Sequence, residues 1–173
     1  AALWSKDFGN VFGVGHPAVF DDKVYVQQCD HTPGTFLWSF TASNGNLVFS
    51  QPFGAQWETY WAPIVVGGTV FGNGGYYGGL YGWNATTGGE SFFNNSLEQY
   101  DEWSPAYADG AVYTFVAGNL RAHDPVTGVI QWTKAVTWNW AGWSMATTPV
   151  LSGTHAFVVA PPALHAVELS THL

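Results

Sequence analysis

The fold is decided by the stretch Ser104-Pro-Ala-Tyr-Ala-Asp-Gly-Ala-Val-Tyr113 and by Leu120-Arg-Ala-His-Asp-Pro-Val-Thr-Gly-Val-Ile-Gln-Trp132, which follows it. The first part places Asp109-Gly110, a pair typical of tight hairpin turns, between two apolar runs. In the second part, Asp124 can accept hydrogen bonds from the backbone amides of a turn, and Gly128 can adopt a positive φ. The stretch therefore predicts a hairpin, a turn and an outer strand that carries Trp132.

Both parts recur along the chain. The hairpin runs have a proline near their start at positions 17, 63, 105 and 149, spaced by 46, 42 and 44 residues. The last position of the turn motif falls at 45, 88, 128 and 172, spaced by 43, 40 and 44 residues. It is a glycine in the first three copies, and the fourth copy breaks off at His172. Two independent markers with one period indicate a repeat architecture.

Each repeat has room for four short strands, and a sheet that small cannot bury both faces unless it stacks against its copies. Aromatic residues make up 17% of the chain and there are 21 glycines, which fits short strands and turns better than long helices. We therefore predict an all-β fold, a single β-propeller region over residues 1–173 made of four-stranded antiparallel blades. The blades cover approximately residues 9–49, 55–92, 98–132 and 141–173, with residues 1–8 as an outer strand of a preceding or closing blade.

The motif Leu-x-Ala-x-Asp-x-x-Thr-Gly-x-x-x-Trp after a Ser-Pro hairpin resembles the PQQ-like (quinoprotein alcohol dehydrogenase-like) β-propeller repeat. Residues 103–132 match it nearly throughout, the second repeat matches well, and the first and fourth match loosely. In that family the aromatic residue at the end of the motif docks onto the adjacent blade. The resemblance implies this docking role for four aromatic residues, next to the turn residues of the motif: Trp4, Phe49, Phe92 and Trp132, with Asp124, Gly45, Gly88 and Gly128.

Propellers of this family usually have seven or eight blades, whereas this chain has four repeats. Three arrangements remain open: the chain is part of a larger propeller, it pairs with another copy to complete an eight-bladed ring, or its four blades close alone. We favour the first arrangement. The expected partners are therefore the remaining blades of the same protein or another copy of it.

The family resemblance also raises the question of catalysis. Quinoprotein dehydrogenases hold PQQ over the propeller centre with a calcium or lanthanide ion, and many have two adjacent cysteines beneath it. Here Cys29 stands between Gln28 and Asp30, so that cysteine pair is absent. We predict no catalytic or metal-ligating residue and no cofactor, and expect a non-catalytic scaffold or binding platform. The alternatives are a fragment of a PQQ-dependent alcohol or sugar dehydrogenase, which would bind PQQ with Ca²⁺, and a building block of an extracellular homo-oligomeric assembly.

Charge and modification motifs limit the location and the partners. With a net charge of −8 and four basic residues, the chain would repel a nucleic acid backbone, and it has no apolar run that could insert into a membrane. The sequons Asn84-Ala-Thr86 and Asn94-Asn-Ser96 favour a secreted or cell-surface protein, or a periplasmic one if it is bacterial. We expect Asn94 to be the better glycan acceptor, because Asn84 occupies the turn position.

The ten tryptophans exceed the number of docking positions, and the extra ones are concentrated ahead of the hairpins. Packing between blades is the simpler interpretation, since aromatic rings dominate such cores. The functional interpretation is a ring-lined surface for carbohydrate or for a protein. Its candidate residues are Trp61, Trp103, Trp138, Trp140 and Trp143, with polar contacts from Glu58 and Glu102.

Overall fold

The computed structural model describes residues 2–9, 11, 13–29, 34–55, 62–74, 79–98, 103–137 and 148–170. Within these residues the chain forms strands β1 to β16 and no helix. The strands make four separate antiparallel sheets, which we call blades 1 to 4 in chain order. The predicted all-β fold is confirmed.

Blade 1 has one strand more than the repeat predicts. Its strands are β1 (Gly13–Val14), β2 (Ala18–Phe20), β3 (Lys23–Cys29), β4 (Phe36–Thr41) and β5 (Leu47–Pro52). Both β1 and β2 pair with the same edge of β3, through Gly13 opposite Cys29 and Ala18 opposite Tyr25. The extra strand arises because β3 is longer than β2, so the far half of β3 has backbone groups left to pair.

The other three blades follow the repeat. Blade 2 contains β6 (Ile64–Val66), β7 (Thr69–Gly74), β8 (Gly79–Asn84) and β9 (Glu90–Asn94). Blade 3 contains β10 (Ala106–Ala108), β11 (Ala111–Val116), β12 (Asn119–His123) and β13 (Ile130–Ala135). Blade 4 contains β14 (Val150–Ser152), β15 (His155–Ala160) and β16 (Ala163–Glu168), three strands within the described residues. In each of these three sheets the neighbouring strands are consecutive in the chain, as in a meander of hairpins.

The short turns inside the hairpins of blades 1 and 3 have the backbone conformation expected from their sequence. Asp21 and Asp22 have φ of 48° and 54°, and Asp109 and Gly110 have φ of 47° and 81°. Two successive positive φ angles are the signature of a type I′ turn, whose twist matches that of the flanking strands. The repeat prolines stand one residue before the innermost strands β2, β6, β10 and β14, where a missing N–H costs no ladder bond.

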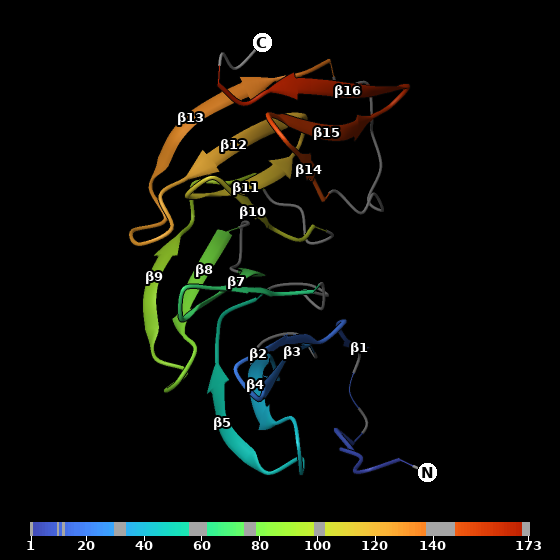
Figure 1. Ribbon diagram of the computed structural model, residues 1–173, viewed down its shortest axis with the longest axis vertical. Helices are drawn as coiled ribbons and strands as arrows, with labels where there is room; N and C mark the ends of the chain where they lie inside the picture. The colour runs from blue at the N-terminus through green and yellow to red at the C-terminus, as the bar shows by residue number, and fades with distance from the viewer. Residues whose placement is uncertain are drawn as a thin grey trace.

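The blades stack one after another in an open arc, with the N-terminal segment beside blade 1 at one end and blade 4 at the other (Figure 1). The innermost strands of consecutive blades are neighbours in space, β2 with β6, β6 with β10 and β10 with β14. Because blades 1 and 4 lie at opposite ends, the four blades do not close alone. Of the three arrangements left open by the sequence, this one is not formed.

The hydrophobic core lies between blades. One cluster, which includes Tyr25 and Trp83, joins blades 1 and 2, and a second, which includes Phe71 and Val112, joins blades 2 and 3. The third, which includes Phe115 and Val158, joins blades 3 and 4. Each cluster draws side chains from two sheets, so the stability of a blade depends on its neighbours.

Candidate functional site

Three aromatic rings of the repeat motif pack against the turn glycine of the following repeat. Each ring occupies the space that a Cβ atom on the glycine would need, and each glycine has a φ between 71° and 75°. Two independent reasons therefore exclude a larger residue there, the backbone angle and the ring. The pairs, with the closest distance from the ring to the position of that Cβ, are Trp4 and Gly45 (2.7 Å), Phe49 and Gly88 (2.5 Å), and Phe92 and Gly128 (2.3 Å).

Side-chain hydrogen bonds shape the turns that contain these glycines. The Oδ1 atom of Asp124 accepts from the backbone amides of Thr127 (2.8 Å) and Val126 (2.9 Å) and from the Thr127 hydroxyl (2.9 Å). The bonds from Thr127, and then the one from Val126, lower the pKa of the Asp124 carboxyl. Asn84 holds the equivalent turn through the amides of Thr86 and Thr87.

Blades 1 and 2 are also joined by buried hydrogen bonds. The Tyr25 hydroxyl donates to the carbonyl of Ala85 (2.8 Å), and Gln27 Nε2 donates to the carbonyl of Asn73 (2.9 Å). Burial, and to a lesser extent the charge of Asp21, raises the pKa of Tyr25. These two polar side chains therefore fix the position of blade 2 against blade 1.

Blade 3 has a buried cation beside blade 2. Arg121, which is 7% exposed, donates to Glu98 Oε1 at 2.5 Å, and Asn119 Nδ2 donates to the same oxygen at 3.1 Å. Glu98 precedes blade 3 in the chain, and Arg121 lies on β12. An ion pair in which one partner is buried is costly to break, because the charge that remains has lost its solvent.

His123 is fully buried next to the same interface. Its Nδ1 is 3.1 Å from the carbonyl of Gly128 and its Nε2 is 2.9 Å from the Thr114 hydroxyl. A carbonyl only accepts, so Nδ1 carries the proton and Nε2 accepts from Thr114. Burial lowers the pKa of His123 to about 4; the Gly128 bond opposes this and the charge of Arg121 adds to it. His123 is therefore neutral at physiological pH.

Most of the residues that the sequence suggested for ligand binding lie outside the described residues: Glu58, Trp61, Glu102, Trp138, Trp140 and Trp143. Trp103 is described, is 1% exposed and belongs to the core between blades 2 and 3. Its carbonyl accepts a hydrogen bond from Asn73 Nδ2 (2.9 Å). For Trp103 the geometry favours packing between blades over a ring-lined surface.

The two sequons differ in the accessibility of their amide groups. Asn94 Nδ2 donates to the Gly128 carbonyl at 2.7 Å, and the side chain is partly buried. Asn84 is exposed and uses only its Oδ1 in the hydrogen bonds of its turn. An N-glycan is attached through the amide nitrogen, and at Asn94 this nitrogen is engaged with the Gly128 carbonyl. The sequence does not reveal the Asn94 contact, which reaches 34 residues along the chain.

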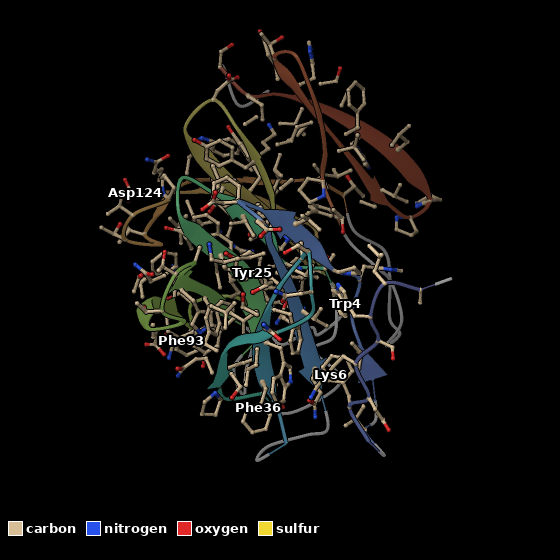
Figure 2. The ribbon with its side chains drawn as sticks, turned by 60° about the horizontal axis from the view of Figure 1, so that its bottom comes forward. Trp4, Lys6, Tyr25, Phe36, Phe93 and Asp124 are labelled. Atoms are coloured by element: carbon tan, nitrogen blue, oxygen red, sulfur yellow. The ribbon has the colours of Figure 1, made fainter. Side chains whose placement is uncertain are left out.

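The N-terminal segment covers an aromatic face of blade 1. Trp4 Nε1 donates to the Ala42 carbonyl at 2.8 Å, and the Phe8 ring contacts Trp38 and Phe40 edge-on. The Lys6 ammonium lies 5.7 Å from the centre of the Trp38 ring, a cation–π distance. Figure 2 shows Trp4 and Lys6 on the segment that runs beside the first sheet.

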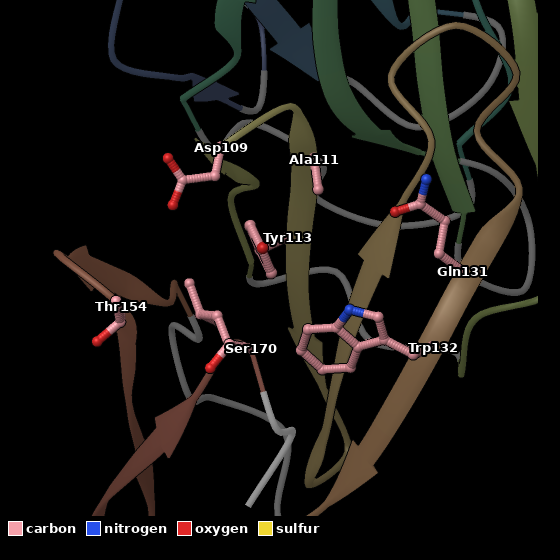
Figure 3. Close-up of a pocket in the computed structure, with 8 residues that line it drawn as sticks. Asp109, Ala111, Tyr113, Gln131, Trp132, Thr154 and Ser170 are labelled. Carbon is pink, nitrogen blue, oxygen red and sulfur yellow. The ribbon is translucent and has the colours of Figure 1, made fainter.

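A pocket of about 310 Å³ opens between blades 3 and 4 (Figure 3). The Trp132 ring forms one side of it and lies 5.9 Å from the Tyr113 ring at an angle of 60°. Burial, and then the Asp109 charge, raises the pKa of Tyr113. Sequence reasoning assigned Trp132 only to docking and missed this pocket. The lining residues are Asp109, Ala111, Tyr113, Gln131, Trp132, Thr154, Leu169 and Ser170.

The described part of the chain lacks two further classes of feature. No three His, Cys, Asp or Glu side chains gather there closely enough to hold a metal ion. Likewise, none of the described segments is a helix with the length and apolar character needed to span a membrane.

Comparison with known proteins shows the fold. No family model and no curated protein sequence matches the chain. BamB from Moraxella catarrhalis matches in structure with a TM-score of 0.74 and 15% identity, over 92% of this chain and 50% of that one. A europium-containing methanol dehydrogenase matches with a TM-score of 0.61 and 13% identity, over 91% of this chain and 40% of that one.

The quinohemoprotein alcohol dehydrogenase from Comamonas testosteroni matches with a TM-score of 0.56 and 20% identity, over 71% of this chain and 21% of that one. The chain thus spans half or less of the length of these solved structures. At such low identity the likeness concerns the fold alone. The four antiparallel sheets and these structural neighbours together show that the chain forms blades of a β-propeller.

Proposed function

We propose that the chain is a non-catalytic β-propeller module that acts as a scaffold or binding platform. The observation that carries this proposal is the use of the buried polar side chains. Arg121 is bound to Glu98, and His123 is bound to Thr114 and Gly128, so these side chains hold blades and turns in place. Side chains that are engaged in this way are not available to a substrate.

A secreted or surface location, periplasmic in a bacterium, is part of the same proposal. The exposed Asn84 sequon and the scarcity of basic residues support it. The partners are the remaining blades of the same protein or another copy, and the bound ligand is a carbohydrate or a protein. The net charge of −8 disfavours nucleic acid.

A fragment of a PQQ-dependent alcohol or sugar dehydrogenase is the second candidate. The fold likeness to two dehydrogenases favours it, although the chain covers 40% of one and 21% of the other. Under this alternative, the reaction centre would include parts of a larger protein.

Titration of the full-length natural protein with PQQ and CaCl₂ separates the two candidates. We expect no saturable heat of binding and no alcohol-dependent or sugar-dependent reduction of a dye acceptor. Saturable PQQ binding together with such reduction would overturn the module proposal. Light-scattering mass determination on the same sample would distinguish a larger single-chain propeller from a paired ring or a larger homo-oligomeric assembly.

A further inference from the structure

We propose that the pocket between blades 3 and 4 binds a neutral saccharide, with the Trp132 ring as its stacking surface. The inference rests on the proposed function as a binding module and names the ligand class of one site.

The ring that lines this pocket belongs to the repeat motif. At three earlier positions the motif ring occupies the place of a glycine Cβ, with a closest distance of 2.3 to 2.7 Å from where that atom would lie. The residue that corresponds to this glycine for Trp132 is His172 in the sequence. Trp132 is half-buried and lines the pocket, whereas the pocket of about 410 Å³ between blades 2 and 3 is lined by Phe93 and not by the motif ring Phe92.

The aromatic side of the pocket suits the apolar face of a sugar ring. A pyranose presents C–H groups on its faces and hydroxyls around its edge, so it gains from covering an aromatic surface with one face. The Trp132 indole supplies that surface, and Ala111 and Leu169 add apolar contacts. The Tyr113 ring, at 60° to the indole, supports it from the side of the core.

The polar lining suits the edge of the same ring. Asp109 contributes a carboxylate that accepts from hydroxyls, and the Gln131 amide both donates and accepts. Thr154 and Ser170 add two hydroxyls from blade 4, which bond His155 Nδ1 and Glu168 Oε1 and whose oxygens can still accept from a ligand (Figure 3). A few polar groups around an apolar surface are the usual composition of a small-ligand site, and here they come from both blades.

Charge selects among ligands of this shape. The lining contains one carboxylate and no lysine or arginine, so an anionic sugar would be repelled. An organic cation also fits an aromatic ring beside a carboxylate. The four uncharged hydrogen-bonding groups that accompany the single acid, Tyr113, Gln131, Thr154 and Ser170, favour a polyhydroxylated neutral ligand instead.

The test uses the full-length protein and defined probes: glucose, galactose, mannose, N-acetylglucosamine, cellobiose and chitobiose, with choline as the cationic probe. Saturation-transfer NMR identifies binders, and calorimetry gives their dissociation constants. We expect at least one sugar to bind saturably. Gln131→Ala weakens that binding by about threefold, the size of one lost hydrogen bond, and Trp132→Ala by about tenfold or more.

The repeat supplies matched controls. Ser91→Ala changes the residue that corresponds to Gln131 at the interface where the ring meets a glycine, and Asp21→Asn changes the hairpin position that corresponds to Asp109. Both should leave sugar binding unchanged. Asp109→Asn, at a φ that Asn also tolerates, should weaken sugar binding by a few-fold only, whereas it would abolish binding of a cation.

The inference is overturned if no sugar binds to the folded protein, or if binding is unaffected by both Gln131→Ala and Trp132→Ala. It is also overturned if choline binds and Asp109→Asn abolishes that binding. Thermal unfolding of each variant shows whether a loss reflects the site or the fold, and Gln131→Ala is the decisive variant because Gln131 is exposed. Absence of sugar binding without PQQ binding would refute the pocket assignment alone, whereas catalytic PQQ binding would refute the module.

Discussion

The interface between blades 2 and 3 and the interface between blades 3 and 4 are built from the same repeat motif but differ in the surroundings of its aromatic ring. In the first, Phe92 covers Gly128, and Asn94 binds the Gly128 carbonyl. In the second, Trp132 lines a pocket, and the sequence has His172 where the glycine would stand. Both interfaces have a pocket, but the aromatic ring of the repeat motif lines only the second one: the pocket of about 410 Å³ between blades 2 and 3 is lined by Phe93 and not by Phe92.

The two interfaces also differ in polarity. His123 and Arg121 lie on β12 at the blade 2 side, and the positions of blade 4 that correspond to them are Val167 and His165. Each interface therefore has two parts: the contact between the aromatic ring and the turn, and the side chains on the neighbouring strand, which vary from blade to blade. The two parts can be altered separately by mutation.

The largest effect is expected for Gly128→Ala. The added Cβ would lie 2.3 Å from the Phe92 ring, and φ is 71°. Backbone strain of about 1 kcal/mol and overpacking of about 1 to 3 kcal/mol should lower the free energy of unfolding by about 2 to 4 kcal/mol. Urea denaturation measures the loss.

Gly110→Ala is the control for that experiment. Its φ is 81°, and nothing lies within 4 Å of the added Cβ, so only the strain of about 1 kcal/mol remains. Equal losses for the two variants would mean that the Phe92 ring does not restrict position 128.

As the pH is lowered, the interface between blades 2 and 3 should lose stability at a higher pH than the interface between blades 3 and 4. The pKa of His123 is about 4 in the folded chain against 6.5 for a free histidine. The contribution of His123 to the free energy of unfolding is complete above pH 6.5. It is lost as the pH falls from 6.5 towards 4, because His123 then binds a proton in the unfolded chain but not in the folded chain. The total loss is up to about 3 kcal/mol.

The measurement is the free energy of unfolding as a function of pH, compared with His123→Gln, which does not titrate. The difference between the two curves should shrink as the pH falls through this range. Parallel curves would show that His123 does not titrate with unfolding. Hydrogen exchange at pH 5 should show the change in β11 and β12 and not in β15 and β16.

A double-mutant cycle sharpens the comparison further. In a Phe92→Ala background the cost of Gly128→Ala should fall to that of Gly110→Ala, which gives a coupling energy of about 1 to 3 kcal/mol. Trp132→Ala combined with Gly128→Ala should be close to additive, because the ring that fills the Gly128 site is Phe92. Additivity in both cycles would argue against ring-to-glycine contacts as the link between blades.

The smallest effect is expected for Asp124→Asn. Asn84 accepts the same two backbone hydrogen bonds from the equivalent position, so the free energy of unfolding should change little. Asp124→Ala, which removes the acceptor, should lower the free energy of unfolding by more than Asp124→Asn does. A large loss for Asp124→Asn would show that charge, and not the hydrogen-bond acceptor, forms this turn.

The fold was predictable because its two markers depend on local chemistry. Hairpin pairs such as Asp109-Gly110 and turn glycines such as Gly128 are set by the φ angles that a few residues tolerate. Strand β1 was not predictable, because it depends on the length of β3 and not on a motif of its own.

The candidate site was less accessible to sequence reasoning. Glu98 and Arg121 meet across 23 residues, and no repeat position predicts Glu98. The burial of Trp103 is set by the neighbouring blade, which one residue type cannot reveal. The pocket between blades 3 and 4 could not be predicted either, because its lining combines Asp109 and Trp132 of blade 3 with Ser170, which follows the last strand of blade 4.

The ring-to-glycine contact also affects how such a chain can lengthen. The partners stand at positions 4 and 45, 49 and 88, and 92 and 128, so every contact is completed within roughly one repeat. A duplicated repeat would bring both a ring for the next copy and a glycine for the previous one. Gene duplication can therefore add or remove units without inventing a new junction, and substitution of a single glycine codon is enough to end that uniformity at a chosen place.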